Sequence, residues 1–256
     1  MPGLSLERRM ITTEWDPLTS GGRWSMIRHP MSAVSFRIDL HVHSLLSGDN
    51  MADPEECIVR AIEVGLQGLA FTEHYSYEVS EPLERLKERY RDKILVVRGV
   101  EFSAAEGHCL VFGVDTDRLC LPYTPAEELV REVGRAGGVV IPSHPYRAGS
   151  GLGDRILALR GFAAVEGHNG CNHRSFNQRA IQAALRLRLP LTGGSDAHRP
   201  VDVGSCHTVF PERVTADNLV DLLKAGNFEA VDTRKVSRGW PFGADEQAAG
   251  KGHGSF

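Results

Sequence analysis

The histidines of this chain gather at one kind of position. There are eleven of them, and most stand where a short apolar run, interpreted as a β-strand, comes to its end. Acidic residues stand at the same kind of position. Imidazole and carboxylate groups suit Zn, Mn and Fe, and no cysteine in the set selects a softer metal. The residues that share this placement are His41, His43, His74, Glu101, His144, Asp196 and His198, with His108 at the start of a further run.

Two pairs in this set have the spacing of a strand. His41 and His43 are two residues apart, so on a strand both side chains point to the same face. Asp196 and His198 repeat that spacing. A single histidine at a strand end is more often a hydrogen-bonded residue of the core or rim than a ligand. Imidazole and charged groups are costly to bury together without a cation, so we predict that the set as a whole binds metal.

The elements that must position these side chains follow a βα rhythm from residue 36 onward. The pattern predicts strands at 36–43, 68–74, 94–102, 108–114, 139–144, 163–168 and 190–195, and a short strand that ends at Val209. It predicts helices at 54–64, 82–91, 125–136, 175–187 and 216–225. About seven βα units without a linker indicate a parallel barrel. Because the carboxyl ends of barrel strands converge on one face, we expect the set to meet there.

The rest of the chain adds little to this core. Its 256 residues fit one large α/β domain. We predict a poorly ordered N-terminal extension at 1–35, the barrel at 36–236 and a loose C-terminal tail at 237–256. The extension has no clear period and is interrupted by Gly21, Gly22 and Pro30.

Composition and charge exclude some classes of function. The chain is 41% hydrophobic and 24% charged, with a net charge of −4, which is typical of a globular protein. The mild acidity argues against a dedicated nucleic-acid surface, although a nucleotide or short oligonucleotide could still be a substrate. No apolar run approaches ~18 residues, so no membrane span is expected. A cytoplasmic location is expected because no signal peptide is evident and the five cysteines form no CxxC pair.

Six segments between residues 36 and 211 contain these side chains. They are DLHVHS at 39–44, TEH at 72–74, GVEFS at 99–103, GHCLVFG at 107–113, SHPYR at 143–147 and GGSDAH at 193–198. In content and order they resemble the motifs of one known family, the PHP (polymerase and histidinol phosphatase) phosphoesterases. The resemblance implies a distorted (β/α)7 TIM-like barrel that carries two or three divalent metal ions.

The resemblance also implies a ligand set of nine residues. The family's usual TDH is TEH here, so Glu73 replaces an aspartate, and we expect it to orient a ligand histidine. Glu101 is the expected bridge between two metals. His41, His43 and Asp196 would complete one site, His108 and His144 the second, and Asp49, His74 and His198 a third. The implied ligands are His41, His43, Asp49, His74, Glu101, His108, His144, Asp196 and His198.

Several neighbouring residues are candidates for other roles. Asn169 is expected to line the pocket, with His168 at its rim. Arg147 could bind a phosphate oxygen with its guanidinium fork, or it could form a surface ion pair, and the sequence does not decide between these. Arg179 is a weaker candidate for contact with a phosphate oxygen. A structural role is expected for His207.

The mechanism that the resemblance implies is metal-dependent phosphoester hydrolysis by a hydroxide that bridges two cations. Glu101 and Asp196 hold the metals, and His198 or a water ligand protonates the leaving alcohol. A small phosphomonoester or nucleotide is the expected substrate. The alternatives are a nuclease acting on oligonucleotide ends and a non-catalytic metal-binding or interaction module. A nuclease ranks lower because few basic or aromatic residues follow the predicted strands.

Overall fold

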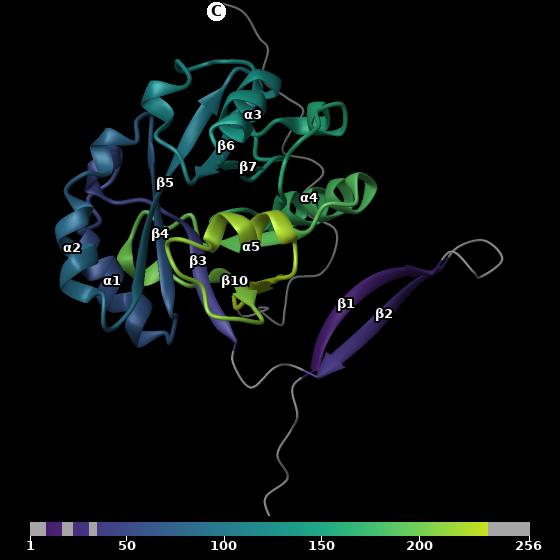
Figure 1. Cartoon of the computed structure of the whole chain (residues 1–256), viewed down its shortest axis with the longest axis horizontal. Coiled ribbons are helices and arrows are strands. Elements are labelled where there is room, and N and C mark those ends of the chain that lie inside the picture. The colour runs from purple at the N-terminus through teal and green to yellow at the C-terminus, as the bar shows by residue number, and fades with distance from the viewer. Residues whose placement is uncertain (1–8, 17–22, 31–34, 235–256) are drawn as a thin grey trace, which may run out of the picture.

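The structure is a computed structural model, and it describes residues 9–16, 23–30 and 35–234 (Figure 1). Two strands, β1 (Arg9–Asp16) and β2 (Arg23–Pro30), pair antiparallel and form a two-stranded sheet of their own. This pairing falls inside the segment expected to be a poorly ordered extension, whereas the rest of 1–34 and the tail from 235 lie outside the described residues. The proposed division of the chain therefore stays a prediction.

The main sheet has seven strands in the order β11-β10-β3-β4-β5-β6-β7 and curls into half a barrel. Strands β3, β4 and β5 are parallel, and the other pairings in this sheet are antiparallel. The strands are β3 (Phe36–Val42), β4 (Gly68–His74), β5 (Leu95–Ala104), β6 (Gly107–Phe112), β7 (Val139–Pro142), β10 (Cys206–Phe210) and β11 (Glu229–Asp232).

A second, two-stranded parallel sheet completes the curve. It consists of β8 (Val165–Asn169) and β9 (Leu191–Gly194). Strand β9 packs beside β3 and β10, and β8 packs beside β7. Beyond β9, Ala197 forms an isolated parallel bridge with Val42 at the end of β3. The two sheets therefore enclose one interior that opens at the ends of β3, β4 and β5.

Five α-helices lie in the described part of the chain. The capping residues follow the expected pattern: Asp53 accepts hydrogen bonds from two first-turn amides of α1, and Gly226 ends α5 in the left-handed conformation. In Figure 1, α1 and α2 lie beside β3 and β4, and α3 lies beside β6 and β7. The helices are α1 (Pro54–Glu63), α2 (Leu83–Tyr90), α3 (Ala126–Arg135), α4 (Arg174–Leu187) and α5 (Leu219–Ala225).

The α/β class is confirmed, but the strict alternation of seven βα units is not. Strand β6 follows β5 through a turn of two residues, and β10 and β11 pair antiparallel at the other edge. Parallel neighbours need a crossover of a dozen or more residues, so β5 and β6 could only form a hairpin.

No helix in the described residues is long and apolar enough to cross a bilayer.

Candidate metal centre

Glu101 lies at the middle of a cluster of imidazole rings. It stands on β5 with its side chain 1% exposed. Its Oε1 lies 2.7 Å from His144 Nε2 and 3.3 Å from His108 Nδ1. Its two oxygens therefore face different groups of histidines. On the Oε2 side, at 3.3 to 3.5 Å, are His41, His43 and His74.

Asp196 is the second buried carboxylate of the cluster. Its Oδ1 lies 3.4 Å from His41 Nε2 and 3.3 Å from His43 Nε2. Its Oδ2 is 2.5 Å from Arg147 Nη2 and accepts a hydrogen bond of 3.1 Å from Asn169 Nδ2. One oxygen thus faces the imidazoles, and the other is held by neutral and cationic donors.

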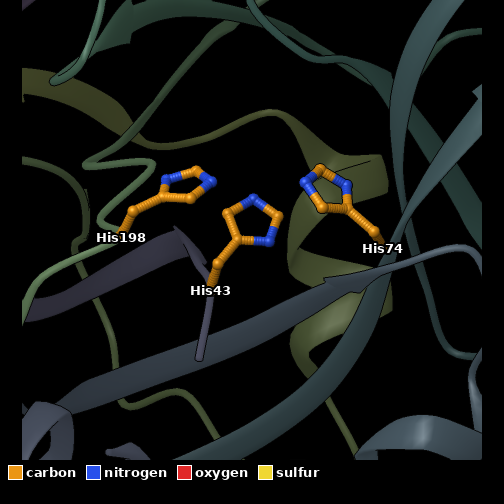
Figure 2. Close-up of side chains that lie close together, drawn as sticks. All are labelled: His43, His74 and His198. Atoms are coloured by element: carbon orange, nitrogen blue, oxygen red, sulfur yellow. The ribbon is translucent and has the colours of Figure 1, made fainter. Parts of the chain in front are cut away.

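The more exposed edge of the cluster contains Asp49, His74 and His198. The Asp49 carboxylate lies 3.0 Å from His74 Nε2 and 3.3 Å from His198 Nε2. Figure 2 shows the His43 ring between those of His198 and His74. The centroids of these ring pairs are 4.6 and 4.3 Å apart. This edge is where a ligand from solvent can reach the cluster.

Three local structures bring these residues together. His41 and His43 point to one face of β3, as their spacing predicts, and their Nε2 atoms are 3.0 Å apart. His108 begins an antiparallel strand, so it shares the sheet end at which β5 carries Glu101. Asp196 lies in a turn with φ of 54°, and its amide donates to the His41 carbonyl at 2.7 Å.

Buried partners fix which nitrogen of a histidine faces the centre. His41 Nδ1 lies 2.8 Å from Glu166 Oε1, so Nδ1 donates to that carboxylate and Nε2 faces the centre. His43 Nδ1 lies 3.2 Å from Ser47 Oγ, and that hydroxyl donates to Glu73. Glu73 therefore acts on His43 through Ser47, in line with the orienting role expected for it.

The charges of the cluster support one another. Burial raises the pKa of the Glu101 carboxyl, but the charges of His41 and His144 outweigh it and hold the pKa well below its usual value. Burial also raises the pKa of the Asp196 carboxyl, but the charge of His41 and a hydrogen bond from His43 outweigh it and hold this pKa well below its usual value. Burial lowers the pKa of His43, but Asp196 and Glu101 raise it to about 9. Each carboxylate is thus stabilised as an anion next to nitrogen donors.

The donor set fits divalent metal ions. Three groups of side chains have ligand atoms within 4.8 Å of one another: His43, His74 and His198; His41, His43, Glu101 and Asp196; and His74, Glu101 and His108. Three buried polar atoms of the cluster have no hydrogen-bond partner among the described residues: Asp196 Oδ1, His108 Nδ1 and His144 Nδ1. Such atoms are costly in a protein interior unless something compensates them, and a cation would do so.

All nine predicted ligands lie in or beside this cluster, although their grouping differs in part from the expectation. His41, His43, Glu101 and Asp196 form one group, as expected. His74, expected with Asp49 and His198, also joins Glu101 and His108. Their roles as ligands stay a prediction.

The predicted substrate residues lie beside Asp196. Arg147 donates through Nε to Asn172 and through Nη2 to Asn169, at 2.8 and 2.9 Å. Its ion pair is with the buried Asp196 and not with a surface acid. Asn169 donates to both Glu166 and Asp196. Both residues therefore hold Asp196, while a contact of either with phosphate stays a prediction.

The histidines judged peripheral lie outside the cluster. His168 is near Asp232 and Arg234, and His207 Nδ1 lies 3.4 Å from the Gly204 carbonyl.

Glu166 was not predicted from the sequence. It is the lone carboxylate in the otherwise uncharged strand β8, and this is a signal that could have identified it.

Family models match two parts of the chain. A PHP domain matches residues 39–148, and a PHP-associated region matches residues 174–228. The chain belongs to the PHP family. No curated protein sequence matches it.

Solved structures share the fold. PsfC from Pseudomonas syringae PB-5123 has 23% sequence identity and a TM-score of 0.61, over 78% of this chain and 92% of that one. A protein from Bifidobacterium adolescentis assigned as a metal-dependent phosphoesterase has 17% identity and a TM-score of 0.51, over 64% and 88%. The lesion-specific endonuclease PfuEndoQ from Pyrococcus furiosus has 15% identity and a TM-score of 0.57, over 77% and 58%. At these identities the likeness shows the fold alone.

Proposed function

We propose that this protein is a metal-dependent phosphoesterase that hydrolyses a small phosphomonoester or a nucleotide. The observation that carries the proposal is Glu101, whose two oxygens face separate groups of imidazoles. Neighbouring ligand groups that share a carboxylate are typical of sites for two or more cations, and such sites suit displacement at phosphorus. The similar structures include a protein assigned as a metal-dependent phosphoesterase and a lesion-specific endonuclease, which supports the same class.

The residues that would hold the metals are the nine predicted ligands. Bound Zn, Mn or Fe ions would supply Lewis acidity that polarises the phosphoryl group and acidifies water. Glu166, Ser47 and Glu73 orient His41 and His43, and Arg147 with Asn169 fixes Asp196. The protein thus holds its donors in place before substrate arrives.

His198 is placed to handle the proton of the leaving alcohol. Its Nδ1 lies 2.9 Å from the Asp196 carbonyl oxygen, which can only accept, so Nδ1 carries a hydrogen. Its Nε2 faces Asp49 at the exposed edge, with the side chain 35% exposed. When no cation occupies the group formed by His43, His74 and His198, His198 can hold a proton at Nε2 and give it to a departing oxygen.

Phosphate release tests the proposal. Mn- or Zn-loaded protein is incubated with a panel of phosphomonoesters, nucleotides and short oligonucleotides, with Asp196→Ala as the blank. We expect release that the blank lacks. Cleavage of oligonucleotide ends in preference to all small esters would favour a nuclease instead. No release above the blank with any metal would contradict the phosphoesterase and leave a metal-binding module.

A further inference from the structure

Tyr75 follows His74 directly and exposes its ring at the open edge of the metal centre. The residue is 62% exposed. Its ring centroid lies 5.6 Å from that of His74, with the two planes at 49°. His74 is itself beside Asp49 and Glu101. A large apolar surface therefore adjoins the side of the cluster that solvent can reach.

The backbone at Tyr75 is held in a costly conformation. Its φ is 72°, and the Ser76 amide donates to the His74 carbonyl at 2.9 Å, which closes a three-residue turn around Tyr75. A bulky residue at positive φ is an outlier, and a three-residue turn of this sign is rare and strained. The Tyr75 side chain therefore leaves the backbone in a different direction from the one it would have at the end of an extended strand.

Two of the residues with a strained backbone lie in the metal centre, and Tyr75 lies beside it. In the part of the chain that the structure describes, five residues other than glycine have positive φ. Two of them, His144 and Asp196, are predicted ligands, and a third, Arg188, is the C-cap of α4. The remaining two are the exposed residues Tyr75 and Tyr123. Strain of this kind persists where the surroundings impose it, and it gathers at functional sites.

Asp117 fixes the segment that follows Tyr75. Its carboxylate accepts hydrogen bonds from Ser76 Oγ at 2.6 Å and from the amides of Tyr77 and Glu78, both at 2.9 Å. Burial raises the pKa of Asp117, but the Ser76 hydroxyl and the two amides lower it below its usual value. The exposed ring is therefore attached to a rigid support, and little conformational freedom would be lost when a flat ligand covers it.

We propose that Tyr75 is a stacking platform for a planar leaving group, so that the site selects nucleotides over phosphate esters that lack a base. The proposal rests on the proposed function, because the ester bond must lie over the metal centre while the base reaches past His74. An exposed aromatic face stacks on any nucleobase. No aliphatic ester would use this surface in the same way.

Binding of two matched probes to the Mn-loaded protein tests the proposal. AMP and ribose 5-phosphate carry the same phosphate on the same primary alcohol and differ only in the base. Both are used as their non-hydrolysable phosphonate analogues, so that dissociation constants can be measured by calorimetry without turnover for the unmodified protein, Tyr75→Ala and Tyr75→Phe. We expect AMP to bind roughly tenfold tighter than ribose 5-phosphate. This preference should disappear in Tyr75→Ala and survive in Tyr75→Phe, while the affinity for ribose 5-phosphate stays unchanged.

Tyr123 provides the matched control. It is also an exposed tyrosine at positive φ, with φ of 64°. Its amide donates a hydrogen bond to the Ser103 carbonyl, and among the described residues its ring contacts no predicted ligand. Tyr123→Ala should keep the preference for AMP. A loss as large as that in Tyr75→Ala would overturn the assignment to Tyr75, and so would equal affinity of the unmodified protein for both probes.

Turnover separates this proposal from the proposed function. Hydrolysis of AMP and ribose 5-phosphate themselves at equal kcat/KM, with no effect of Tyr75→Ala, would refute the platform and leave the phosphoesterase intact. A preference for AMP in binding without phosphate release would do the reverse. It would support the platform and contradict the hydrolysis of this ester.

Discussion

Glu166 connects three parts of the metal centre with one side chain. Its Oε1 lies 2.8 Å from His41 Nδ1, and its Oε2 accepts from the His144 amide at 2.7 Å and from Asn169 Nδ2 at 2.9 Å. All of these groups are buried, so each bond forms without competition from water. An imidazole whose second nitrogen is bound to a carboxylate is a fixed and more basic metal ligand.

We predict that Glu166→Gln weakens metal binding by about 10- to 100-fold. Glutamine has one acceptor oxygen where glutamate has two, so either His41 or the donors from His144 and Asn169 would lose their partner. The dissociation constant for Mn or Zn, measured by competition with a chelator, checks this. His168→Asn, on the same strand but outside the cluster, is the control. Unchanged affinity in Glu166→Gln would show that Glu166 does not support the metal centre.

The positions of these residues explain which of them the sequence could reveal. Strand ends converge, so histidines at successive ends could be predicted to meet although they are distant in the chain. Glu166 stands inside a strand, where a lone carboxylate marks it as unusual, but its partners depend on how β8 lies relative to β3, which no local pattern encodes. The contacts of Arg147 were open for the same reason, because they depend on Asn169 and Asp196 being brought beside it.

The short 3₁₀ helix η1 (Leu45–Ser47) is fastened to β4 by Glu73. The carboxylate accepts from the Ser44 amide at 3.0 Å, from Ser44 Oγ at 2.5 Å and from Ser47 Oγ. Glu73 is fully buried. The loop that carries Asp49 to the exposed edge therefore begins from an anchored turn.

We predict that Glu73→Gln lowers the free energy of unfolding by about 1–3 kcal/mol, because an amide group cannot accept all three hydrogen bonds and leaves a buried donor unpaired. Urea unfolding measures the change. Glu63→Gln, at an exposed position on α1, is the control and should differ from the unmodified protein by less than about 0.5 kcal/mol. A loss of that small size in Glu73→Gln would mean that the turn does not depend on this carboxylate.

The turn at Tyr75 makes a prediction of opposite sign to the usual rule. Glycine normally destabilises relative to alanine because it has more freedom when unfolded. At φ of 72°, alanine keeps the backbone strain and glycine relieves it. We therefore predict that the free energy of unfolding of Tyr75→Gly is higher than that of Tyr75→Ala by about 1 kcal/mol. Thermal or urea unfolding of the two variants compares them, and the reverse order would argue against strain at this turn.

The pairing of strands was the weakest part of the fold prediction. Apolar periodicity identifies a strand but not the direction of its neighbour. One signal was present, since the expected strands at 94–102 and 108–114 leave five residues between them, too few for a parallel crossover. Strand β11 (Glu229–Asp232) was not predicted, because its four residues are only partly buried and show no apolar run. The helices, whose caps are local, agree with the prediction within three residues at each end.

The metal centre joins parts of the chain that are far apart in sequence. Its residues come from the ends of β3 and β4, the loop after η1, the interior of β5, the start of β6, the loop after β7 and the turn after β9. Asp39 adds a buried tie across the same region, because its carboxylate accepts from the amides of Ser195 and Gly204, both at 2.8 Å. A cation site built from several of these segments would exist only in the folded state, so the free energy of cation binding would contribute to the stability of the fold.

Metal removal is therefore predicted to lower the stability of the whole domain. A ligand at 100 times its dissociation constant stabilises the folded state by about 2.7 kcal/mol, which for a domain of this size corresponds to a melting temperature about 5–10 °C higher. We expect melting in EDTA to occur lower by that amount and to recover when Mn or Zn is restored. Asp196→Ala should melt at the same temperature with and without EDTA. An equal EDTA effect in Asp196→Ala would place the stabilising ion elsewhere, and no effect in the unmodified protein would mean that the cluster of imidazoles and carboxylates is stable without one.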